Sequence, residues 1–597
     1  MMTTARRFAP LAIFVIVFLS FLPALDGQFL DWDDRENLVR NAGYRGLGWA
    51  QLKWMFTTTV LGHYIPLTWL SFGINYALGG LNPWGYHLLN LLLHSANAAL
   101  FYVVARRLLA AGIEGTSSQT WRLTAGAAFA ALVFGVHPLR VESVAWITER
   151  RDVLCGFFFL LAVLAWLRAI ERPGGPDRRW QLLSLAAFLA SLLSKAASMP
   201  LPGVLVLLDL YPLGRLKARG WRSVLLEKLP HFALAAGAAG LALVALRISG
   251  VSVTSYQSYG AGARLAMTAY SLVFYPWKFL WPSGLSPLYE LPARVDPMAL
   301  QFLLPMIAFF LVTAALIAFR RRWAGALAAW AFSAIMVLPV SGVVHAGYQL
   351  AHDRYSYLSG LGFAVLAGAA LIWVLGAGER GRLRPPIVGL LMATAALLVL
   401  TWSADTWRQS RVWRDSENLW RWAVDRDPAC AVCHNNLGTA IIDTQPLTPR
   451  RVAEAESHFR IAIRLRPERS SAYLNLATML AMQKRYPESE AAFRDLMAKH
   501  PEDPSGPALL GELLMERGRS EEAVTSLRRA QSMAPRAREV QVALARALRA
   551  RAGELAAKGR RPEAAALEKE AGALEAAAQR STTSDREPRA ASRCAAR

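Results

Sequence analysis

Long apolar runs alternate with short polar segments from the start of the chain to about residue 405, and a charged, helix-forming sequence follows. A helix needs about 20 apolar residues to cross the hydrocarbon core of a bilayer. Runs that reach or nearly reach this length lie near residues 9–25, 86–105, 123–139, 153–170, 180–196, 198–212, 229–247, 299–319, 324–343, 357–376 and 386–404. The pattern therefore predicts an all-α, polytopic membrane helix bundle of about eleven transmembrane helices over residues 1–405.

The first apolar run also resembles the core of a signal peptide. Residues 11–24 follow Arg6 and Arg7, but no small-x-small cleavage site comes after them. Because many further apolar runs follow, we expect a first helix that is retained in the protein.

The placement of basic residues indicates the orientation of this bundle. The chain has a net charge of +23, and much of it lies in short loops on the side of the N-terminus. By the positive-inside rule these loops face the cytoplasm, so the N-terminus is inside and the segment after the last run is outside. The same placement accounts for the basic charge, and no nucleic-acid partner is predicted.

Two further apolar stretches, residues 64–81 and 265–282, are interrupted by Pro, Gly and polar residues. Both must begin and end outside if the basic loops stay inside. We interpret them as re-entrant or interfacial helices, since irregular backbone at membrane depth is tolerated where it lines a cavity. One more pair of ordinary spans is the open alternative.

A repeat with a period of 34 residues begins after residue 420. Pro467, Pro501 and Pro535 are spaced by this interval, and Pro428 lies 39 residues before the first of them. Each unit also repeats a tight first-helix contact (Leu437-Gly438, Leu476-Ala477, Leu510-Gly511), a small second-helix residue (Ala455, Ser489, Ala523) and a large one four positions later (Phe459, Phe493, Leu527). This period is the signature of tetratricopeptide repeats (TPRs), which stack pairs of antiparallel helices into a solenoid.

These repeats set the predicted domain boundaries. We expect a connecting helix over residues 406–427, a TPR solenoid of three clear repeats plus a cap over 428–576, and a disordered tail over 577–597. The extra residues of the first unit fall in its inter-helix turn, DTQPLTP.

The first repeat opens with Cys430, Cys433 and His434 in a C-x-x-C-H pattern, which is also the attachment pattern of c-type haem. A packed repeat helix leaves little room for a haem, so a local disulfide or free thiols are favoured. No cofactor and no metal site are predicted, and a divalent cation is left open.

Ionisable residues gather at positions that the predicted topology places on the outer face. The candidates are Asp33 and Asp34 after the first run, His137, Arg140 and Glu142 between the third and fourth, Lys195 between the fifth and sixth, and His352 and Arg354 after the ninth. Carboxylates can act as a general base, and Arg or Lys can hold a phosphate. Ordinary charged loops are the alternative for each group alone. There is no P-loop, Gly-rich dinucleotide turn or G-x-S-x-G elbow, so a soluble nucleotide-sugar or ATP site is not indicated.

Four segments carry a resemblance to a known family. They are HYIPLTWLSFGINYALGGLNPWGYHLLNLLLHSANA (63–98), HPLRVESVAWITERRDVL (137–154), SKAASMPLP (194–202) and AHDRYSYLSG (351–360). With the terminal repeats, they make the chain similar to the transmembrane-and-TPR O-mannosyltransferases of the GT-C glycosyltransferase superfamily. The resemblance covers nearly the whole chain.

The resemblance implies transfer of a sugar, mannose or similar, from a polyprenyl-phosphate donor to a hydroxyl acceptor on the extracytoplasmic face. It implies Asp33 as the leading base candidate, narrowly ahead of Asp34, and places Arg354 and Lys195 toward the lipid phosphate. Arg140, Glu142, His137 and His352 are the further substrate-binding candidates. Ala196 follows Lys195 where relatives commonly have Glu, which weakens the assignment of that segment.

Other functions remain open at this point. A non-catalytic TPR membrane scaffold for envelope or secretion partners is the main alternative, and a flippase, ligase or polymerase of envelope polysaccharide is the third. Ala-, Arg- and Leu-rich usage suggests a bacterium with GC-rich DNA. We therefore expect a multi-pass inner (cytoplasmic) membrane protein with a periplasmic TPR domain that recruits a protein or glycan acceptor, with the endoplasmic reticulum as the alternative location.

Overall fold

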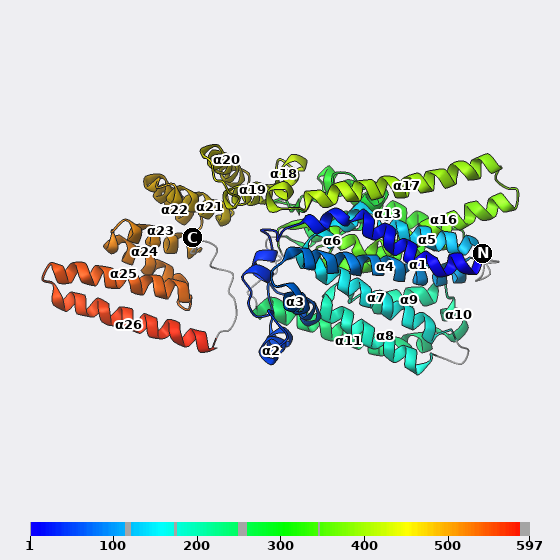
Figure 1. The fold of residues 1–597 in the computed structure, drawn as a ribbon, viewed down its shortest axis with the longest axis horizontal. Coiled ribbons are helices and arrows are strands. Elements are labelled where there is room, and N and C mark those ends of the chain that lie inside the picture. Colours follow the sequence, from blue (N-terminus) through cyan, green and yellow to red (C-terminus); the bar gives the residue numbers. More distant parts are fainter. Residues whose placement is uncertain (1, 114–120, 172–175, 249–258, 344–346, 585–597) are drawn as a thin grey trace. The chain divides into compact units, whose positions relative to one another are not determined.

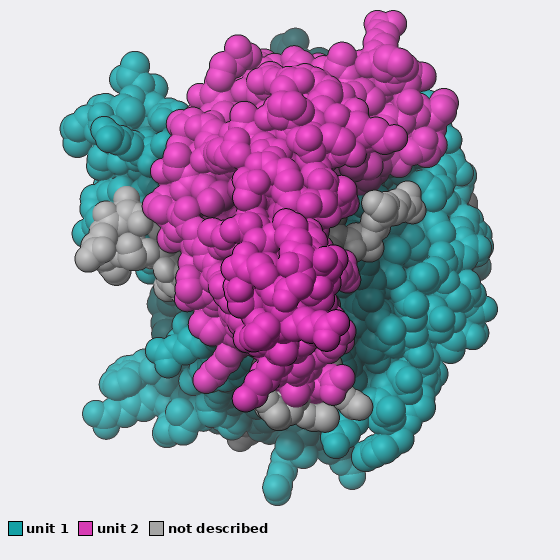
Figure 2. All heavy atoms as spheres, turned by 90° about the vertical axis from the view of Figure 1, so that its left-hand side faces the viewer, with its two compact units in different colours: residues 1–422 teal, residues 423–597 magenta. Residues whose placement is uncertain are grey.

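The computed structural model describes residues 2–113, 121–171, 176–248, 259–343 and 347–584 of the chain (Figure 1). The chain divides into two compact units, Met1–Trp422 and Ala423–Arg597 (Figure 2). In the first unit the long helices run roughly parallel to one another (Figure 1).

Each of the predicted apolar runs lies on a helix. These helices are α1 Met2–Ser20, α4 Pro83–Gly112, α5 Trp121–Gly135, α7 Arg150–Ala169, α8 Arg178–Ser194, α9 Leu201–Leu210, α11 Trp221–Ile248, α13 Leu300–Ala318, α14 Ala324–Val337, α16 Leu361–Glu379 and α17 Pro385–Val412. In the described residues, six helices are long and apolar enough to cross a membrane: α4, α11, α13, α16, α17 and the helix Ile147–Ala169 that contains α7. A seventh is reached if α5 and the bent segment Pro138–Ala145 count as one span.

The predicted count of eleven spans is thus not reached by length and composition. Four of the helices are short, since α5 has 15 residues, α8 has 17, α9 has 10 and α14 has 14. Hydropathy finds the apolar residues but does not show where a helix breaks, and here it breaks at prolines. Pro138 follows the end of α5, and Pro200 and Pro202 are the N-cap and the second residue of α9; proline has no N–H to continue a preceding helix but fits the first turn of a new one.

The remaining elements of the first unit lie between these helices. They are α2 Trp49–Thr57, α3 Pro66–Gly79, α6 Val141–Ala145, α10 Arg215–Arg219, α12 Ala261–Leu280, α15 Ser356–Ser359 and α18 Ser416–Arg426, whose last residues belong to the second unit. Helices α3 and α12 occupy the two interrupted apolar stretches, and their re-entrant character stays a prediction. The segment 406–427 is not one connecting helix, because α17 ends at Val412 and α18 begins at Ser416.

One small antiparallel ladder interrupts the all-helical fold. Strand β1, Tyr289–Glu290, pairs with β2, Gln349–Ala351, with Tyr289 opposite Ala351. The Tyr289 hydroxyl donates to a carboxylate oxygen of Asp353 at 3.0 Å. The ladder therefore fixes the backbone just before Arg354.

The second unit consists of consecutive helix pairs. They are α19 Ala431–Asp443 with α20 Pro449–Leu465, α21 Ser470–Met482 with α22 Tyr486–Lys499, α23 Ser505–Glu516 with α24 Ser520–Met533, and α25 Arg538–Ala557 with α26 Arg561–Ser584. The turn after α19 is longer than the turns after α21 and α23, as the extra residues of the first repeat predict. Helix α26 continues to Ser584, so the tail predicted from residue 577 is helical at its start, and residues 585–597 lie outside the described residues.

Close packing within each pair follows the repeat pattern. A Cβ atom at Gly438 would lie 2.7 Å from the Phe459 ring, so only glycine allows α19 and α20 to approach this closely. The recurring second-helix residues are fully or almost fully buried: Ala455, Ser489, Ala523, Phe459, Phe493 and Leu527. The second unit thus has the helix pairs that a TPR period predicts.

Candidate active site

Asp34 is fully buried and hydrogen-bonded at both carboxylate oxygens. One oxygen accepts the Leu30 backbone N–H at 2.9 Å, and the other accepts the backbone N–H and the hydroxyl of Thr148 at 2.9 and 2.6 Å. Burial raises the pKa of Asp34 to about 7. Asp34 therefore ties the segment after α1 to the break before α7 and has no oxygen directed to solvent.

Asp33 lies in a different environment. Its side chain is 28% exposed, and one carboxylate oxygen lies 3.9 Å from Nη2 of Arg151. An accessible carboxylate can accept a proton from a substrate hydroxyl. Of the two adjacent acids, only Asp33 is accessible enough to do so.

Three cations converge on the buried carboxylate of Glu149. Arg151 binds it through two nitrogens at 2.6 and 3.1 Å, Lys195 donates to it at 2.8 Å, and Nε of Arg354 lies 3.2 Å from it. Lys195 also donates to Asp152 at 2.7 Å. Charges removed from water are tolerated when they are paired in this way.

The network continues from Arg354 to Glu142 and His352. Glu142 accepts the Arg354 backbone N–H at 2.9 Å and also its guanidinium. Nδ1 of His352 donates to the Pro287 carbonyl at 2.8 Å and lies 3.4 Å from Glu142. Burial lowers the pKa of Arg354, but the carboxylates of Glu142 and Glu149 raise it by more, so its net pKa is above the ordinary value.

The structure therefore joins five of the predicted site residues in one connected set. Asp33, Lys195, Arg354, Glu142 and His352 come from four separate parts of the sequence and meet through Arg151 and Glu149. We call the acids and bases of this set, with Asp152, the ionic network. One feature differs from the expectation: the charges of Lys195 and Arg354 are already balanced by carboxylates.

His137 and Arg140 do not belong to the ionic network. Nε2 of His137 donates to the Phe279 carbonyl at 2.9 Å, and Nδ1 accepts the Leu139 N–H at 3.2 Å. Its ring also packs on Phe279 and Trp402. One ring nitrogen of His137 thus joins the turn after α5 to α12, and the other caps that turn, whose last residue, Arg140, is fully buried.

Sequence reasoning missed an aromatic stack beside the acids. The Trp32 ring lies 4.9 Å from Trp146 and 4.8 Å from Trp420, and the Arg354 guanidinium lies 5.2 Å from the centre of Trp146. Such cation–π contacts hold an arginine in place. A tryptophan between acids in the sequence LDWDD was the available signal.

His63 is a second residue that the predictions left out. It follows Leu61 and Gly62, whose φ angles of 49° and 79° lie in the left-handed region, and Val60 and His63 close this turn by mutual backbone hydrogen bonds. For a leucine this backbone is strained, a feature that is common at functional sites. Desolvation by the surrounding protein, and then the charges of Arg151 and Lys195, lower the pKa of His63, although the residue is exposed at the surface. His63 is therefore neutral beside the ionic network.

The C-x-x-C-H pattern at Cys430, Cys433 and His434 is the segment of the sequence that resembles a haem-attachment motif. Within the described residues, no group of three or more His, Cys, Asp or Glu side chains could hold a metal ion. In the second unit Cys430 and Cys433 form a disulfide, and both are buried. His434 lies 2.8 Å from His458, so its ring is engaged within the first repeat.

The chain aligns with known proteins over about three quarters of its length. No family model matches it. It is 27% identical over 516 residues to protein O-mannosyl-transferase TMTC1 of Homo sapiens, covering 76% of this chain and 55% of that protein. With TMTC4 of Homo sapiens it shares 27% over 488 residues, covering 73% of this chain and 64% of that protein. The chain is a distant relative of the TMTC protein O-mannosyl-transferases.

The relationship is closer over a shorter stretch. TMTC2 of Homo sapiens is 36% identical over 172 residues, which cover 28% of this chain and 19% of that protein. The chain spans between 53% and 64% of the length of the first four relatives. Among solved structures, a crystal structure of MamA is 18% identical and covers 28% of this chain and 89% of its own, with a TM-score of 0.23, a likeness that supports no further argument.

Proposed function

We propose that this protein is a membrane glycosyltransferase that transfers a sugar, mannose or similar, from a polyprenyl-phosphate donor to a hydroxyl group on the extracytoplasmic face. The observation that carries the proposal is the accessible carboxylate of Asp33, held by Arg151 beside a buried ionic network, in a distant relative of O-mannosyl-transferases. The polyprenyl donor, the sugar and the side of the membrane belong to the proposal.

In the reaction, Asp33 takes the proton from the acceptor hydroxyl as its oxygen forms a bond to the anomeric carbon of the sugar. The bond between this carbon and the phosphate oxygen breaks, and its electron pair leaves on the lipid phosphate. Attack opposite to the leaving group inverts the anomeric centre. The step needs one base and no oxidant or reductant.

The ionic network positions Asp33. Arg151 contacts both Asp33 and Glu149, and Lys195 and Arg354 hold Glu149 in turn. Because the carboxylates balance the charges of Lys195 and Arg354, these two residues act mainly by fixing the carboxylates and Arg151. This role replaces the direct phosphate contact that the resemblance implied for them.

The second unit would recruit the acceptor protein or a partner, as stacked helix pairs commonly do. We place it in the periplasm of a bacterial cell, with the N-terminus in the cytoplasm, eleven spans, and α3 and α12 as re-entrant or interfacial helices. The Cys430–Cys433 disulfide is consistent with this side, since disulfides persist in oxidising compartments.

The proposal is tested with the purified full-length chain in lipid nanodiscs, polyprenyl-phosphate mannose and acceptor peptides, with mass spectrometry to detect mannose on a hydroxyl. Asp33→Asn should lower the rate by about 100- to 10,000-fold, the usual contribution of a general base. Asp31→Asn is the matched control, because Asp31 pairs with Arg35 in the same segment, and its rate should stay within a few-fold.

Equal glycosylation of envelope proteins by cells carrying wild-type protein and Asp33→Asn would contradict the proposal. If the wild-type protein transfers no sugar, and only deletion of residues 428–576 abolishes its cellular role, the scaffold function is correct.

A further inference from the structure

Arg140 is a buried cation without a partner. The side chain has no accessible surface, and none of its three guanidinium nitrogens has a hydrogen-bond partner within the described residues. The guanidinium lies over the rings of Phe134 and Tyr357, at 5.5 and 5.9 Å from their centres. A charge in this position costs stability unless an anion joins it.

The neighbouring Arg150 shows that the fold can satisfy a buried arginine. It is equally buried, but it donates to Asn90, to Asn75 at 2.8 Å and to the Tyr86 carbonyl at 2.7 Å. The lack of partners at Arg140 is therefore a property of its site and not of buried arginines in this bundle.

Nearby acids do not compensate Arg140. Asp152 and Asp353 interact with Arg140 only through long-range electrostatics, without a hydrogen bond. Asp152 accepts from Lys195 at 2.7 Å, and Asp353 accepts from Tyr289 at 3.0 Å. Lys195 and Arg354 are balanced by carboxylates and the nitrogens of Arg150 have neutral partners, so among the described residues Arg140 is a buried cation whose guanidinium can still pair with an added anion.

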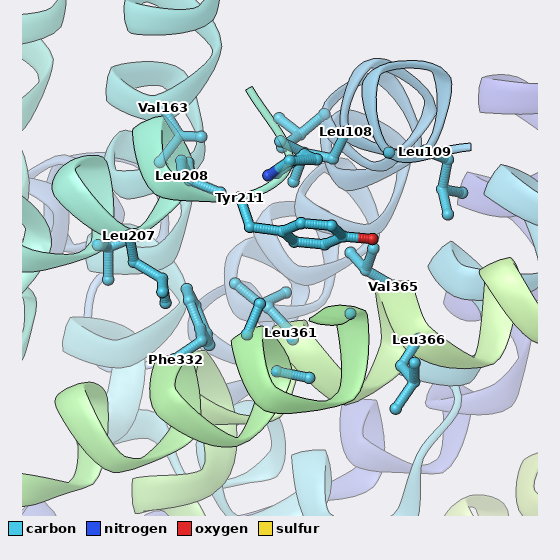
Figure 3. Close-up of a pocket in the computed structure, with 18 of the residues that line it drawn as sticks. Leu108, Leu109, Val163, Leu207, Leu208, Tyr211, Phe332, Leu361, Val365 and Leu366 are labelled. Atoms are coloured by element: carbon cyan, nitrogen blue, oxygen red, sulfur yellow. The ribbon is translucent and has the colours of Figure 1, made fainter. Parts of the chain in front are cut away.

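The residues that follow Gly360, the glycine beside Arg140, line an apolar cavity. A Cβ atom at Gly360 would lie 2.7 Å from Nη2 of Arg140, and the next residues, Leu361 and Gly362, line the cavity. Figure 3 shows its apolar side chains from α4, α7, α9, α14 and α16, with the Tyr211 ring extending toward Val365. Helices α4, α7 and α16 are candidate membrane spans, so the cavity lies among membrane helices.

The size and lining of the cavity suit a hydrocarbon. Its volume is about 120 Å³. An apolar cavity of about 150 Å³ in another protein stays dry and binds benzene, so this space can hold one short branched segment of a hydrocarbon chain.

We propose that Arg140 and this cavity form one site for the lipid carrier. The phosphate pairs with the Arg140 guanidinium, and an isoprenoid unit of the prenyl chain occupies the cavity. The two features fit the two ends of one amphipathic molecule: an anion for an unpaired cation, and a hydrocarbon for an apolar wall among membrane helices. The inference rests on the proposed function, because it assigns the site of that donor.

The experiment measures binding to the purified full-length chain in detergent by native mass spectrometry. The probes are farnesyl phosphate, farnesol and inorganic phosphate, which separate the head from the chain. Arg140→Gln should weaken farnesyl phosphate binding by about ten- to hundredfold, as expected for the loss of a charge-assisted hydrogen bond, and leave farnesol binding unchanged. Arg140→Met is the second variant and should behave alike.

The cavity is tested by a matched pair on α16. Ala369 lines the cavity, whereas Ala370 is exposed on the same helix and does not line it. Ala369→Phe should weaken both farnesyl phosphate and farnesol by about tenfold or more, and Ala370→Phe should weaken neither. This pair decides the question even if substitution of Arg140 prevents folding.

Three results would overturn the inference: unchanged farnesyl phosphate binding by Arg140→Gln, equal effects of Ala369→Phe and Ala370→Phe, or inorganic phosphate that binds as tightly as farnesyl phosphate. The failure of this inference is distinct from the failure of the proposed function. A chain that binds farnesyl phosphate through Arg140 but transfers no sugar contradicts the function alone. A chain that transfers sugar with an unchanged KM in Arg140→Gln contradicts the site alone.

Discussion

Thr148 donates both its backbone N–H and its hydroxyl to the same carboxylate oxygen of Asp34, at 2.9 and 2.6 Å. The two residues lie 114 positions apart in the sequence. Their contact fixes the segment that carries Asp33 against the start of the helix that carries Glu149 and Arg151. Asp34 thus serves the geometry of the site, and Asp33 remains the accessible acid.

This contact predicts an unusual pH dependence of stability. Burial raises the pKa of Asp34 from 3.8 to about 7, so the folded chain keeps a proton that the unfolded chain releases above about pH 4. The stability contributed by the protonated group is fully present below about pH 4 and is lost as the pH rises through about 7, by about 4 kcal/mol at most. Asp34→Asn cannot titrate. The difference in thermal midpoint between wild type and Asp34→Asn should therefore be larger at pH 5 than at pH 8.

Asp34→Asn also places an amide N–H opposite the Leu30 N–H, which loses a hydrogen bond in the interior and should cost about 1–3 kcal/mol. Circular dichroism of the purified chain across this pH range measures both effects. The same pH slope in wild type and variant would show that Asp34 does not titrate in this window.

Replacing Lys195 should destabilise the fold, because its ammonium joins two buried carboxylates. Its ammonium donates to Glu149 and Asp152, so Lys195→Met leaves two carboxylates without this partner. Removing one member of a buried ion pair typically costs about 3–5 kcal/mol. Thermal unfolding should show this loss, whereas Lys217→Met, at an exposed lysine of α10, should stay within about 0.5 kcal/mol of wild type.

A double variant distinguishes electrostatic loss from general disruption. Combining Lys195→Met with Asp152→Asn removes one of the two orphaned charges and should recover about 0.5–3 kcal/mol as coupling energy. Strict additivity of the two substitutions would mean that Lys195 and Asp152 do not interact in solution.

The sequence allowed the helices to be predicted better than the contacts between them. Apolar runs marked each long helix of the first unit, because burial and membrane depth demand the same residues. The 34-residue period marked the helix pairs, because each copy packs a small first-helix residue against a large second-helix residue, as Gly438 packs on Phe459 and Gly511 on Leu527. Both signals are local in sequence. The number of spans is harder to predict, because breaks inside apolar sequence, such as the one at Pro138, leave helices too short to be assigned by length and composition.

The candidate site was predictable only as a set of residue types on one face. Which cation pairs with which carboxylate depends on positions such as Glu142 and Arg354, which are 212 residues apart. Arg140 and Arg354 each follow a histidine within three residues, yet within the described residues Arg354 pairs with two carboxylates and Arg140 with none. His63 gave no signal, because its proximity to Arg151 and Lys195 arises from the turn at Leu61 and Gly62.

The Cys430–Cys433 disulfide predicts a redox-dependent stability of the second unit. The bond closes a very short loop at sequence separation 3, for which chain entropy gives about 2 kcal/mol. Dithiothreitol should therefore lower the thermal midpoint of the wild-type chain. Cys430→Ser is the control: a serine can still cap α19 toward the N–H of residue 433, so this variant lacks only the cross-link and should not respond to reductant. A wild-type midpoint that is insensitive to dithiothreitol would show that the bond does not form.

Replacing glycine by alanine at two positions of the second unit should change its stability in opposite directions, which tests how its helices pack. At Gly438 an added Cβ would lie 2.7 Å from the Phe459 ring, so Gly438→Ala forces α19 and α20 apart and should cost about 1–3 kcal/mol. At Gly553, exposed within α25, an added Cβ meets nothing within 4 Å. Gly553→Ala should therefore stabilise the helix by about 0.5–1 kcal/mol, since alanine loses less backbone entropy than glycine. For a unit of this size each kcal/mol shifts the midpoint by about 2–4 °C, which circular dichroism resolves. If Gly438→Ala is tolerated as well as Gly553→Ala, the two helices do not pack at this distance, and the tetratricopeptide assignment of the first repeat loses its basis.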